Sequence, residues 1–85
     1  MTVTILYFAR LREALGRSCE ELDLPADVRD LAALRRLLAA RGGPWSEVLG
    51  AGTNVRAAVN QTMARGDEAV KRGDEIAFFP PVTGG

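Results

Sequence analysis

The stretch TVTILYF, residues Thr2–Phe8, decides the fold. It is rich in β-branched and aromatic residues and contains neither Gly nor Pro, which predicts a β-strand. Because successive side chains of a strand point to opposite faces of a sheet, Val3, Ile5 and Tyr7 are expected to face the core. We expect this strand to lie in the middle of a sheet.

A second central strand is predicted at Glu75–Phe79 (EIAFF), since the Pro80-Pro81 pair that follows cannot continue a hydrogen-bonded ladder. Between the two strands we expect a helix at Ala9–Leu15, a strand at Ser18–Leu24, a helix at Leu31–Arg41, a strand at Val55–Gln61 and a short strand at Glu68–Val70. The conformation of residues 42–54 stays open. One long amphipathic helix crossing a mixed sheet of four to five strands, with the first and last strands central and parallel, indicates an α+β, ubiquitin-like β-grasp fold.

Length and composition restrict the classes of protein that fit. The 85 residues predict one domain, residues 1–79, followed by an extended tail, residues 80–85. Eleven basic and eleven acidic residues cancel, which argues against a nucleic-acid-binding protein. The absence of His excludes catalysis by a histidine base and a histidine-ligated metal site. A single cysteine, Cys19, and the lack of a signal-like or membrane-spanning segment predict a cytoplasmic protein.

The tail is the most informative segment for function. It carries no charged side chain and consists of Pro80, Pro81, Val82, Thr83, Gly84 and Gly85. Fully extended, a segment of this length reaches roughly 20 Å. The prolines stiffen its base, and the terminal glycines are thin enough to enter a narrow channel. The alternative is an ordinary frayed chain end.

A candidate interface follows from the same strand alternation. If the first and last strands are neighbours, Leu6, Phe8, Ala77 and Phe79 share the sheet face opposite the helix, and Met63 borders it. Exposed aromatic side chains beside a flexible terminus would suit burial against a partner. The alternative is that residues 42–54 cover this face.

Charged residues in the middle of the chain are interpreted as solvated. Glu20, Glu21 and Asp23 are expected to form a charged sheet edge rather than a metal site. Arg35 and Arg36 are expected on the water-facing side of the long helix.

Three blocks of sequence resemble a known family. They are LYFARLREALG (Leu6–Gly16), AAVNQ (Ala57–Gln61) and GDEIAFFPPVTGG (Gly73–Gly85). In order and spacing they resemble the small subunit of molybdopterin synthase, also called molybdopterin-converting factor subunit 1, in the ubiquitin-like sulfur carrier family. The resemblance spans essentially the whole chain. Its last block is the most specific, because a terminal Gly-Gly alone also occurs in ubiquitin.

The resemblance implies a covalent cycle at the C-terminus. A ubiquitin-activating-type adenylyltransferase, using ATP and Mg, would adenylate the carboxylate of Gly85, and a sulfur donor protein would convert it to a thiocarboxylate. The tail would then insert into the large synthase subunit and donate sulfur to cyclic pyranopterin monophosphate, forming the molybdopterin dithiolene. Catalytic groups would belong to the large subunit, in a heterotetramer of two small and two large subunits. This chain would bind no cofactor, metal, nucleic acid or membrane.

Individual residues match family positions. Phe8, Met63 and Phe79 match the hydrophobic contact with the large subunit, beside Leu6, and Arg12 matches a family arginine for which a contact role is expected. Gly84 and Gly85 would be needed because a Cβ at either position would crowd the channel.

Three alternatives remain at this point. One is a sulfur carrier of the thiamin-thiazole type, against which the run Phe78–Thr83 argues. Another is a ubiquitin-like protein modifier, whose terminal glycine would be joined to lysines. The third, from another class, is a non-catalytic β-grasp interaction module with an inert tail.

Overall fold

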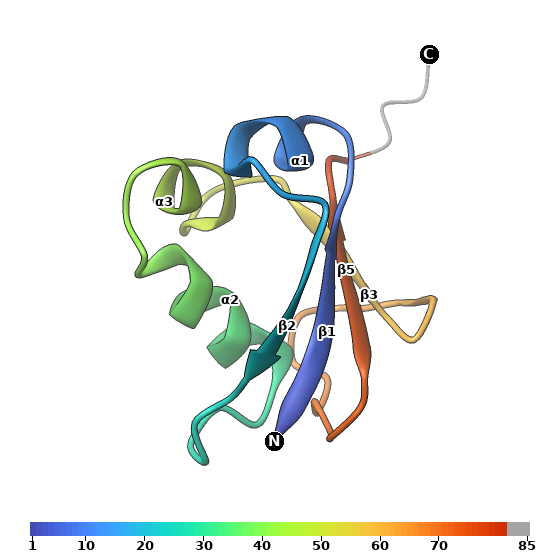
Figure 1. The fold of residues 1–85 in the computed structure, drawn as a ribbon. Coiled ribbons are helices and arrows are strands. Elements are labelled where there is room, and N and C mark those ends of the chain that lie inside the picture. Colours follow the sequence, from blue (N-terminus) through green and yellow to red (C-terminus); the bar gives the residue numbers. More distant parts are fainter. Residues whose placement is uncertain (82–85) are drawn as a thin grey trace.

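The computed structural model describes residues 1–81, and Figure 1 shows a twisted sheet with α2 and α3 on one side and α1 near one end. The elements are β1 (Thr2–Tyr7), α1 (Arg10–Leu15), β2 (Cys19–Asp23), α2 (Leu31–Ala39), α3 (Pro44–Leu49), β3 (Arg56–Val59), β4 (Thr62–Met63) and β5 (Glu75–Phe79). No helix among these residues is long and apolar enough to cross a membrane.

The sheet has the predicted β-grasp topology. Its five strands lie in the order β2-β1-β5-β3-β4. The central pair, β1 and β5, is parallel, with Ile5 beside Ile76 and Tyr7 beside Phe78. All other pairs are antiparallel. The expectation that the first and last strands are central and parallel is therefore confirmed.

The core lies between the sheet and the helices. The predicted inward face of β1 is confirmed, because Val3, Ile5 and Tyr7 are buried. They pack in one cluster with Ile76 and Phe78 of β5, and with the apolar side of α2, namely Leu31, Leu34 and Leu38. Because these side chains occupy one face of the sheet, the alternate residues of the same strands lie on the face away from the helices.

The prediction of one long helix is wrong. The helix α2 has nine residues, and it begins where the Asp30 carboxylate accepts a 2.8 Å hydrogen bond from the Ala33 amide. It ends before Gly42 and Gly43, both of which have positive φ. Pro44, which is tolerated in a first helical turn, then starts α3 within the segment whose conformation the sequence left open.

The predicted strand at Val55–Gln61 is too long. It ends at Val59, because Asn60 and Gln61 have φ values of 50° and 68° and form the turn of a hairpin. The returning strand, β4, is absent from the sequence-based prediction. The strand predicted at Glu68–Val70 is reduced to one bridge between Ala69 and Asp30.

Arg35 does not face water as predicted. Its Nε donates to the Leu49 carbonyl at 2.8 Å, and its Nη2 donates to the carbonyls of Gly50 at 3.3 Å and Thr53 at 3.2 Å, and to the Thr53 hydroxyl. The guanidinium thus fixes the end of α3 and the segment after it by binding three of their carbonyl oxygens. Arg36, one residue along, is exposed as predicted.

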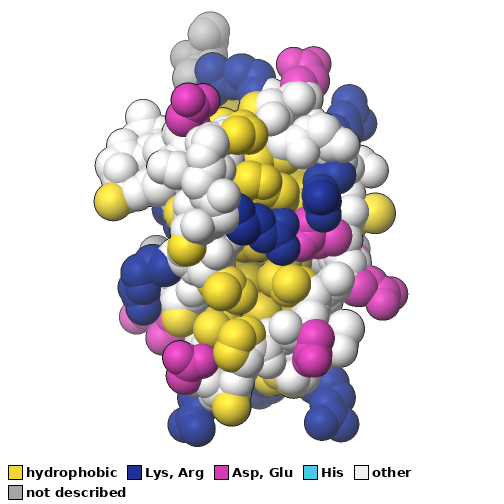
Figure 2. Space-filling model, turned by 60° about the vertical axis from the view of Figure 1, so that its left-hand side comes forward, with side chains coloured by type: hydrophobic (Ala, Val, Ile, Leu, Met, Phe, Trp, Pro, Cys, Tyr) yellow, Lys and Arg dark blue, Asp and Glu magenta, His cyan; other side chains and the backbone are white. Residues whose placement is uncertain are grey.

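Glu20 is not a solvated edge residue either. Its side chain is only 9% exposed and forms ion pairs of 2.7 Å with both Arg17 and Arg41. The Arg41 guanidinium lies 4.3 Å from the centre of the Trp45 ring. The centre of that ring lies 5.5 Å from the centre of the Tyr7 ring, in an edge-to-face arrangement. Figure 2 shows basic and acidic side chains meeting amid apolar surface on the side of the molecule toward α2 and α3.

This cluster shifts the protonation of two groups. Burial opposes ionisation of Glu20, but hydrogen bonds and charge attraction from Arg41, followed by those from Arg17, outweigh it and hold the pKa of Glu20 below its usual value. Burial, and then the charge of Glu20, raise the pKa of the Tyr7 hydroxyl well above its usual value. Both groups therefore keep their ordinary charge at neutral pH.

Candidate functional site: an apolar sheet face beside the tail

The sheet face away from the helices carries an apolar row that crosses four strands. Leu6 of β1 pairs with Ala77 of β5, Ala77 pairs with Ala58 of β3, and Ala58 pairs with Met63 of β4. Paired residues of neighbouring strands point to the same face, so these four side chains are adjacent.

Two aromatic residues extend this row toward the end of the sheet. Phe8 follows Tyr7 of β1, and Phe79 is the last residue of β5. Together the six residues form what we call the apolar patch: Leu6, Phe8, Ala58, Met63, Ala77 and Phe79. Sequence alternation predicted four of them, Leu6, Phe8, Ala77 and Phe79, and Met63 was expected at the border of the same face. Ala58 was missed, although its position next to the core residue Ala57 implies the opposite face.

The apolar patch is accessible. Phe8 is 46% exposed and Met63 is 57% exposed, and they are the only large hydrophobic residues among residues 1–81 classed as exposed. Leu6, Ala77 and Phe79 are half-buried. Residues 42–54 do not cover this face, because α3 lies on the opposite side of the sheet (Figure 1). An exposed apolar surface of this kind is typical of a protein interaction site.

The other half of the same sheet face is polar. Thr4 of β1 lies between Glu21 of β2 and Glu75 of β5. The face therefore divides along its strands into a polar part near the start of β1 and an apolar part near its end. A partner that buries the apolar part need not desolvate these carboxylates.

The apolar part coincides with the point where the chain leaves the sheet. Because β1 and β5 are parallel, Phe8 and Phe79 lie at the same end, and the Phe8 amide donates to the Phe78 carbonyl at 3.1 Å. Pro80 and Pro81 follow and are half-buried. Val82, Thr83, Gly84 and Gly85, which the sequence singled out, lie outside the described residues.

The connection between Phe8 and α1 is strained. Ala9 has φ 53° and ψ −127°, a region that residues with a Cβ rarely occupy. The Leu11 amide donates to the Phe8 carbonyl at 3.1 Å, so the turn is tied down directly after Phe8. This feature could not be predicted, because nothing about an alanine signals positive φ.

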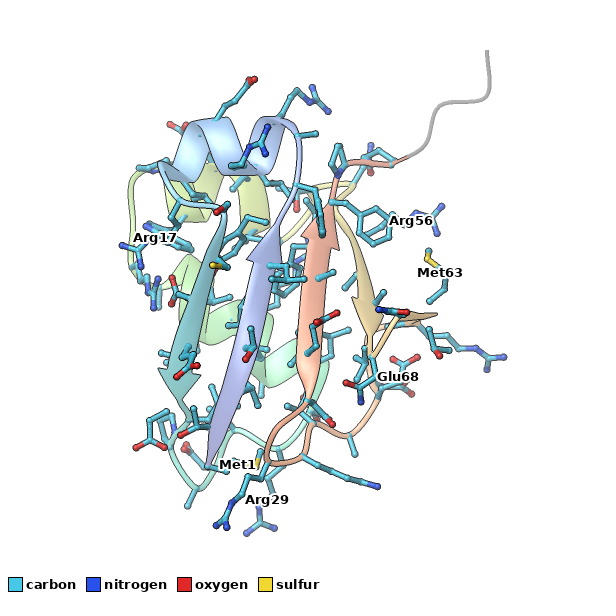
Figure 3. All side chains as sticks on the ribbon, turned by 45° about the vertical axis from the view of Figure 1, so that its right-hand side comes forward. Met1, Arg17, Arg29, Arg56, Met63 and Glu68 are labelled. Carbon is cyan, nitrogen blue, oxygen red and sulfur yellow. The ribbon has the colours of Figure 1, made fainter. Side chains whose placement is uncertain are left out.

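Arg12 lies near the apolar patch but is not part of it. It is exposed on α1, the helix at the patch end of the sheet in Figure 1. Within residues 1–81 its side chain forms no hydrogen bond or ion pair that would fix its direction. Arg56 flanks the patch from the other side, since it pairs with Phe79, and Figure 3 shows it beside Met63 at the margin of the sheet.

The apolar patch contains no titratable side chain, so what it can do chemically is bury apolar surface. At about 25 cal/mol per Å², even a few hundred Å² would supply several kcal/mol of gross binding energy. In the described part of the chain, no three metal-ligating side chains come together.

Comparisons with known proteins agree with this geometry. The ThiS family matches residues 5–85. The molybdopterin synthase sulfur carrier subunit of Escherichia coli (strain K12) is 43% identical over 83 residues, which cover 98% of this chain and 99% of that protein.

Two solved structures share the fold over nearly their full lengths. The small archaeal modifier protein 1 of Haloferax volcanii is 31% identical, with a TM-score of 0.72 and coverage of 95% of this chain and 98% of that one. A chain in the protein–protein complex of subunits 1 and 2 of the molybdopterin-converting factor from Helicobacter pylori 26695 is 26% identical, with a TM-score of 0.68 and full coverage of both chains.

Proposed function

The chain belongs to the ThiS family, and from this premise we propose that it is a sulfur carrier of molybdenum-cofactor biosynthesis. The observation that carries the proposal is the likeness, over nearly the whole of both chains, to the sulfur carrier subunit of molybdopterin synthase. The chain also ends in Gly84-Gly85, so the atom that would carry the sulfur is the terminal carboxyl carbon.

The chemistry begins with an unreactive group. A C-terminal carboxyl has a pKa near 3.5, so at neutral pH it is an anion that repels nucleophiles. An adenylyltransferase that uses ATP and Mg would join the Gly85 carboxylate to AMP and release pyrophosphate. Sulfur supplied by a donor protein at the oxidation level of sulfide would then bond to the carbonyl carbon and displace AMP, which leaves a thiocarboxylate. The thiocarboxylate delivers one sulfur without releasing free sulfide.

The second step takes place in a partner. The large subunit of the synthase would bury the apolar patch and receive the tail in its active site. There the thiocarboxylate of Gly85 would give its sulfur to cyclic pyranopterin monophosphate. A dithiolene contains two sulfurs, so two loaded carriers are needed for each product, in keeping with a heterotetramer of two small and two large subunits.

The geometry supports these separate roles for the carrier and the large subunit. The apolar patch and the start of the tail lie at the same end of the sheet, so binding through Phe8 and Phe79 would aim the tail into the same partner. Arg12, on the exposed side of α1, would contact the large subunit at the rim. The carrier would bind no cofactor itself, and we place it in the cytoplasm together with these enzymes.

The test is reconstitution. The thiocarboxylated chain, the large subunit and cyclic pyranopterin monophosphate should yield molybdopterin. A chain lacking Gly84-Gly85 should yield none, although its circular dichroism should be unchanged, because the hydrophobic core is built from residues up to Phe78. Product formation by the truncated chain would contradict the proposal.

A second role is favoured by one neighbour, the small archaeal modifier protein 1. In that role the activated Gly85 would be joined to a lysine amine of another protein, forming an isopeptide bond and releasing AMP. Mass spectrometry of adducts formed with the activating enzyme but without sulfur would identify it. If the chain is only a sulfur carrier, no Gly-Gly remnant will be found on lysines. A carrier of the thiamin-thiazole type would instead fail to yield molybdopterin in the reconstitution.

A further inference from the structure

A groove of about 880 Å³ lies between α2, the segment 51–55, and β3 with the residues that follow β4. Its floor reaches the core residues Leu31, Leu49 and Phe78. Four arginines contribute to its walls: Arg35, Arg36, Arg56 and Arg65. The side chains of α2 that line it lie on the helix side of the sheet, whereas the apolar patch lies on the other side. Arg56, which flanks the patch, is at the margin of both surfaces.

The charge of the groove is strongly one-sided. The chain as a whole has eleven basic and eleven acidic residues, yet four basic and no acidic residues line this groove. Arg35 is occupied by the carbonyls of the 49–53 segment. Arg36 and Arg65, by contrast, are exposed and form no ion pair within residues 1–81.

The neighbouring carboxylate does not neutralise this charge by an ion pair. Glu68 is close in sequence to Arg65, but its two oxygens accept hydrogen bonds from the backbone amides of Arg65 and Gly66, at 2.6 and 2.8 Å. The guanidinium of Arg65 is thus left for another anion.

We propose that this groove binds an acidic segment of a partner protein. Carboxylates of the segment would pair with Arg36 and Arg65, and an apolar side chain would pack on the half-buried lining residues Ala39, Val55 and Ala64. An extended peptide is favoured over a small molecule, because small-ligand sites enclose most of the ligand, whereas Arg36, Asn54 and Arg65 at this groove are exposed.

The place of the groove indicates which kind of partner uses it. Pro81 lines the groove, so a bound segment would lie beside the start of the tail. The partner is therefore a protein that works on the tail, and it could hold the carrier through this groove while the apolar patch is covered by another subunit. This inference adds a second docking surface to the proposed function and does not depend on the identity of the sulfur acceptor.

The test is an NMR titration of the isotope-labelled full chain with a short synthetic peptide in which leucine and glutamate alternate. Shifts are expected at groove amides such as those of Ala39, Gly52 and Ala64. The double variant Arg36→Glu, Arg65→Glu should weaken binding at least about tenfold, the loss expected when two charge pairs become repulsive. The matched control is Arg29→Glu, Arg72→Glu, which makes the same change in net charge at exposed sites outside the groove and should change the affinity less than about twofold.

The outcomes separate the alternatives. Equal weakening in the two double variants, shifts centred on Phe8 and Phe79, or no shift at all would overturn the proposal. If inorganic pyrophosphate alone produces the same shifts and the same loss in the groove variant, the site is for a small anion and the peptide assignment is wrong. The groove variant should still give molybdopterin with a chemically prepared thiocarboxylate. A failure of peptide binding is thus distinguishable from a failure of the sulfur-carrier proposal.

Discussion

At the scale of single residues, the most consequential group outside the site is Glu20. An acidic residue in a weakly patterned strand is expected to face water at a sheet edge. The structure instead places it between Arg17 and Arg41, whose guanidinium groups both lie over the Trp45 ring. The partners are separated from Glu20 by up to 21 positions, so local pattern carries no sign of this contact.

Replacing Glu20 should therefore change how stability depends on pH. The folded-state pKa of Glu20 is lowered, so its stabilising effect is present above its unfolded pKa of about 4.3 and is lost as the pH falls through the folded-state pKa. Glu20→Gln should lower the free energy of unfolding by about 1–2 kcal/mol near pH 7. The difference from the unmodified chain should shrink toward about pH 3.

Urea unfolding at a series of pH values measures this. Glu21→Gln is the matched control, because Glu21 is the adjacent carboxylate, is exposed and forms no ion pair within residues 1–81. A Glu20→Gln variant whose stability follows the same pH profile as the unmodified chain would show that the ion pairs contribute nothing.

At the scale of elements, the strands that could be predicted are those whose local pattern and packing agree. The central strands β1 and β5 alternate cleanly, and β5 is followed by Pro80-Pro81, so their place in the fold could be predicted. The division of the helical region at Gly42–Pro44 was harder, because a proline both ends one helix and starts the next. The β3–β4 hairpin was missed because Asn60-Gln61 lacks the glycine of the commonest turn.

That hairpin allows a prediction about stability. Asn60 is suited to its positive φ, and its side chain bonds Asp74 and the Glu75 amide, each at 2.9 Å. Gln61 also has positive φ but makes no side-chain hydrogen bond within residues 1–81. Gln61→Gly should therefore relieve strain and raise the free energy of unfolding by about 0.5–1 kcal/mol.

Thermal and urea unfolding of Gln61→Gly check this, with Gln61→Ala as the comparison that shortens the side chain but keeps the Cβ. If the alanine variant gains as much stability as the glycine variant, backbone strain at Gln61 is not the cause.

At the scale of the whole molecule, more of the apolar patch could be predicted from the sequence than of the surfaces that form where distant segments meet. Alternation in two strands known to be central is enough to bring Leu6, Phe8, Ala77 and Phe79 to one face. The arginine-lined groove could not be predicted, because it depends on α2, the 51–55 segment and the turn after β4 meeting in space. Tertiary packing brings these three segments together, and the local sequence of each segment does not indicate the others.

The apolar patch should control binding to the large subunit without controlling stability. Phe8→Ser and Met63→Ser remove exposed apolar side chains, so each should weaken binding by about 1–3 kcal/mol while changing the free energy of unfolding by less than about 0.5 kcal/mol. Calorimetric titration with the large subunit measures the first, and urea unfolding measures the second.

The control for these variants is Arg29→Ser, which truncates a long exposed side chain at the opposite end of the sheet (Figure 3). It should bind like the unmodified chain. Binding that is equally unaffected in all three variants would move the large-subunit interface away from the apolar patch.

The central claim, that Gly85 carries sulfur, is tested most directly by one measurement. This is the intact mass of the chain after incubation with a ubiquitin-activating-type adenylyltransferase, ATP, Mg and a sulfur source. We predict a mass gain equal to one sulfur replacing one oxygen, absent when Gly85 is deleted and absent without ATP. An unchanged mass, with an adenylyltransferase shown to be active on another carrier of the family, would contradict the sulfur-carrier function and leave the chain as an interaction module.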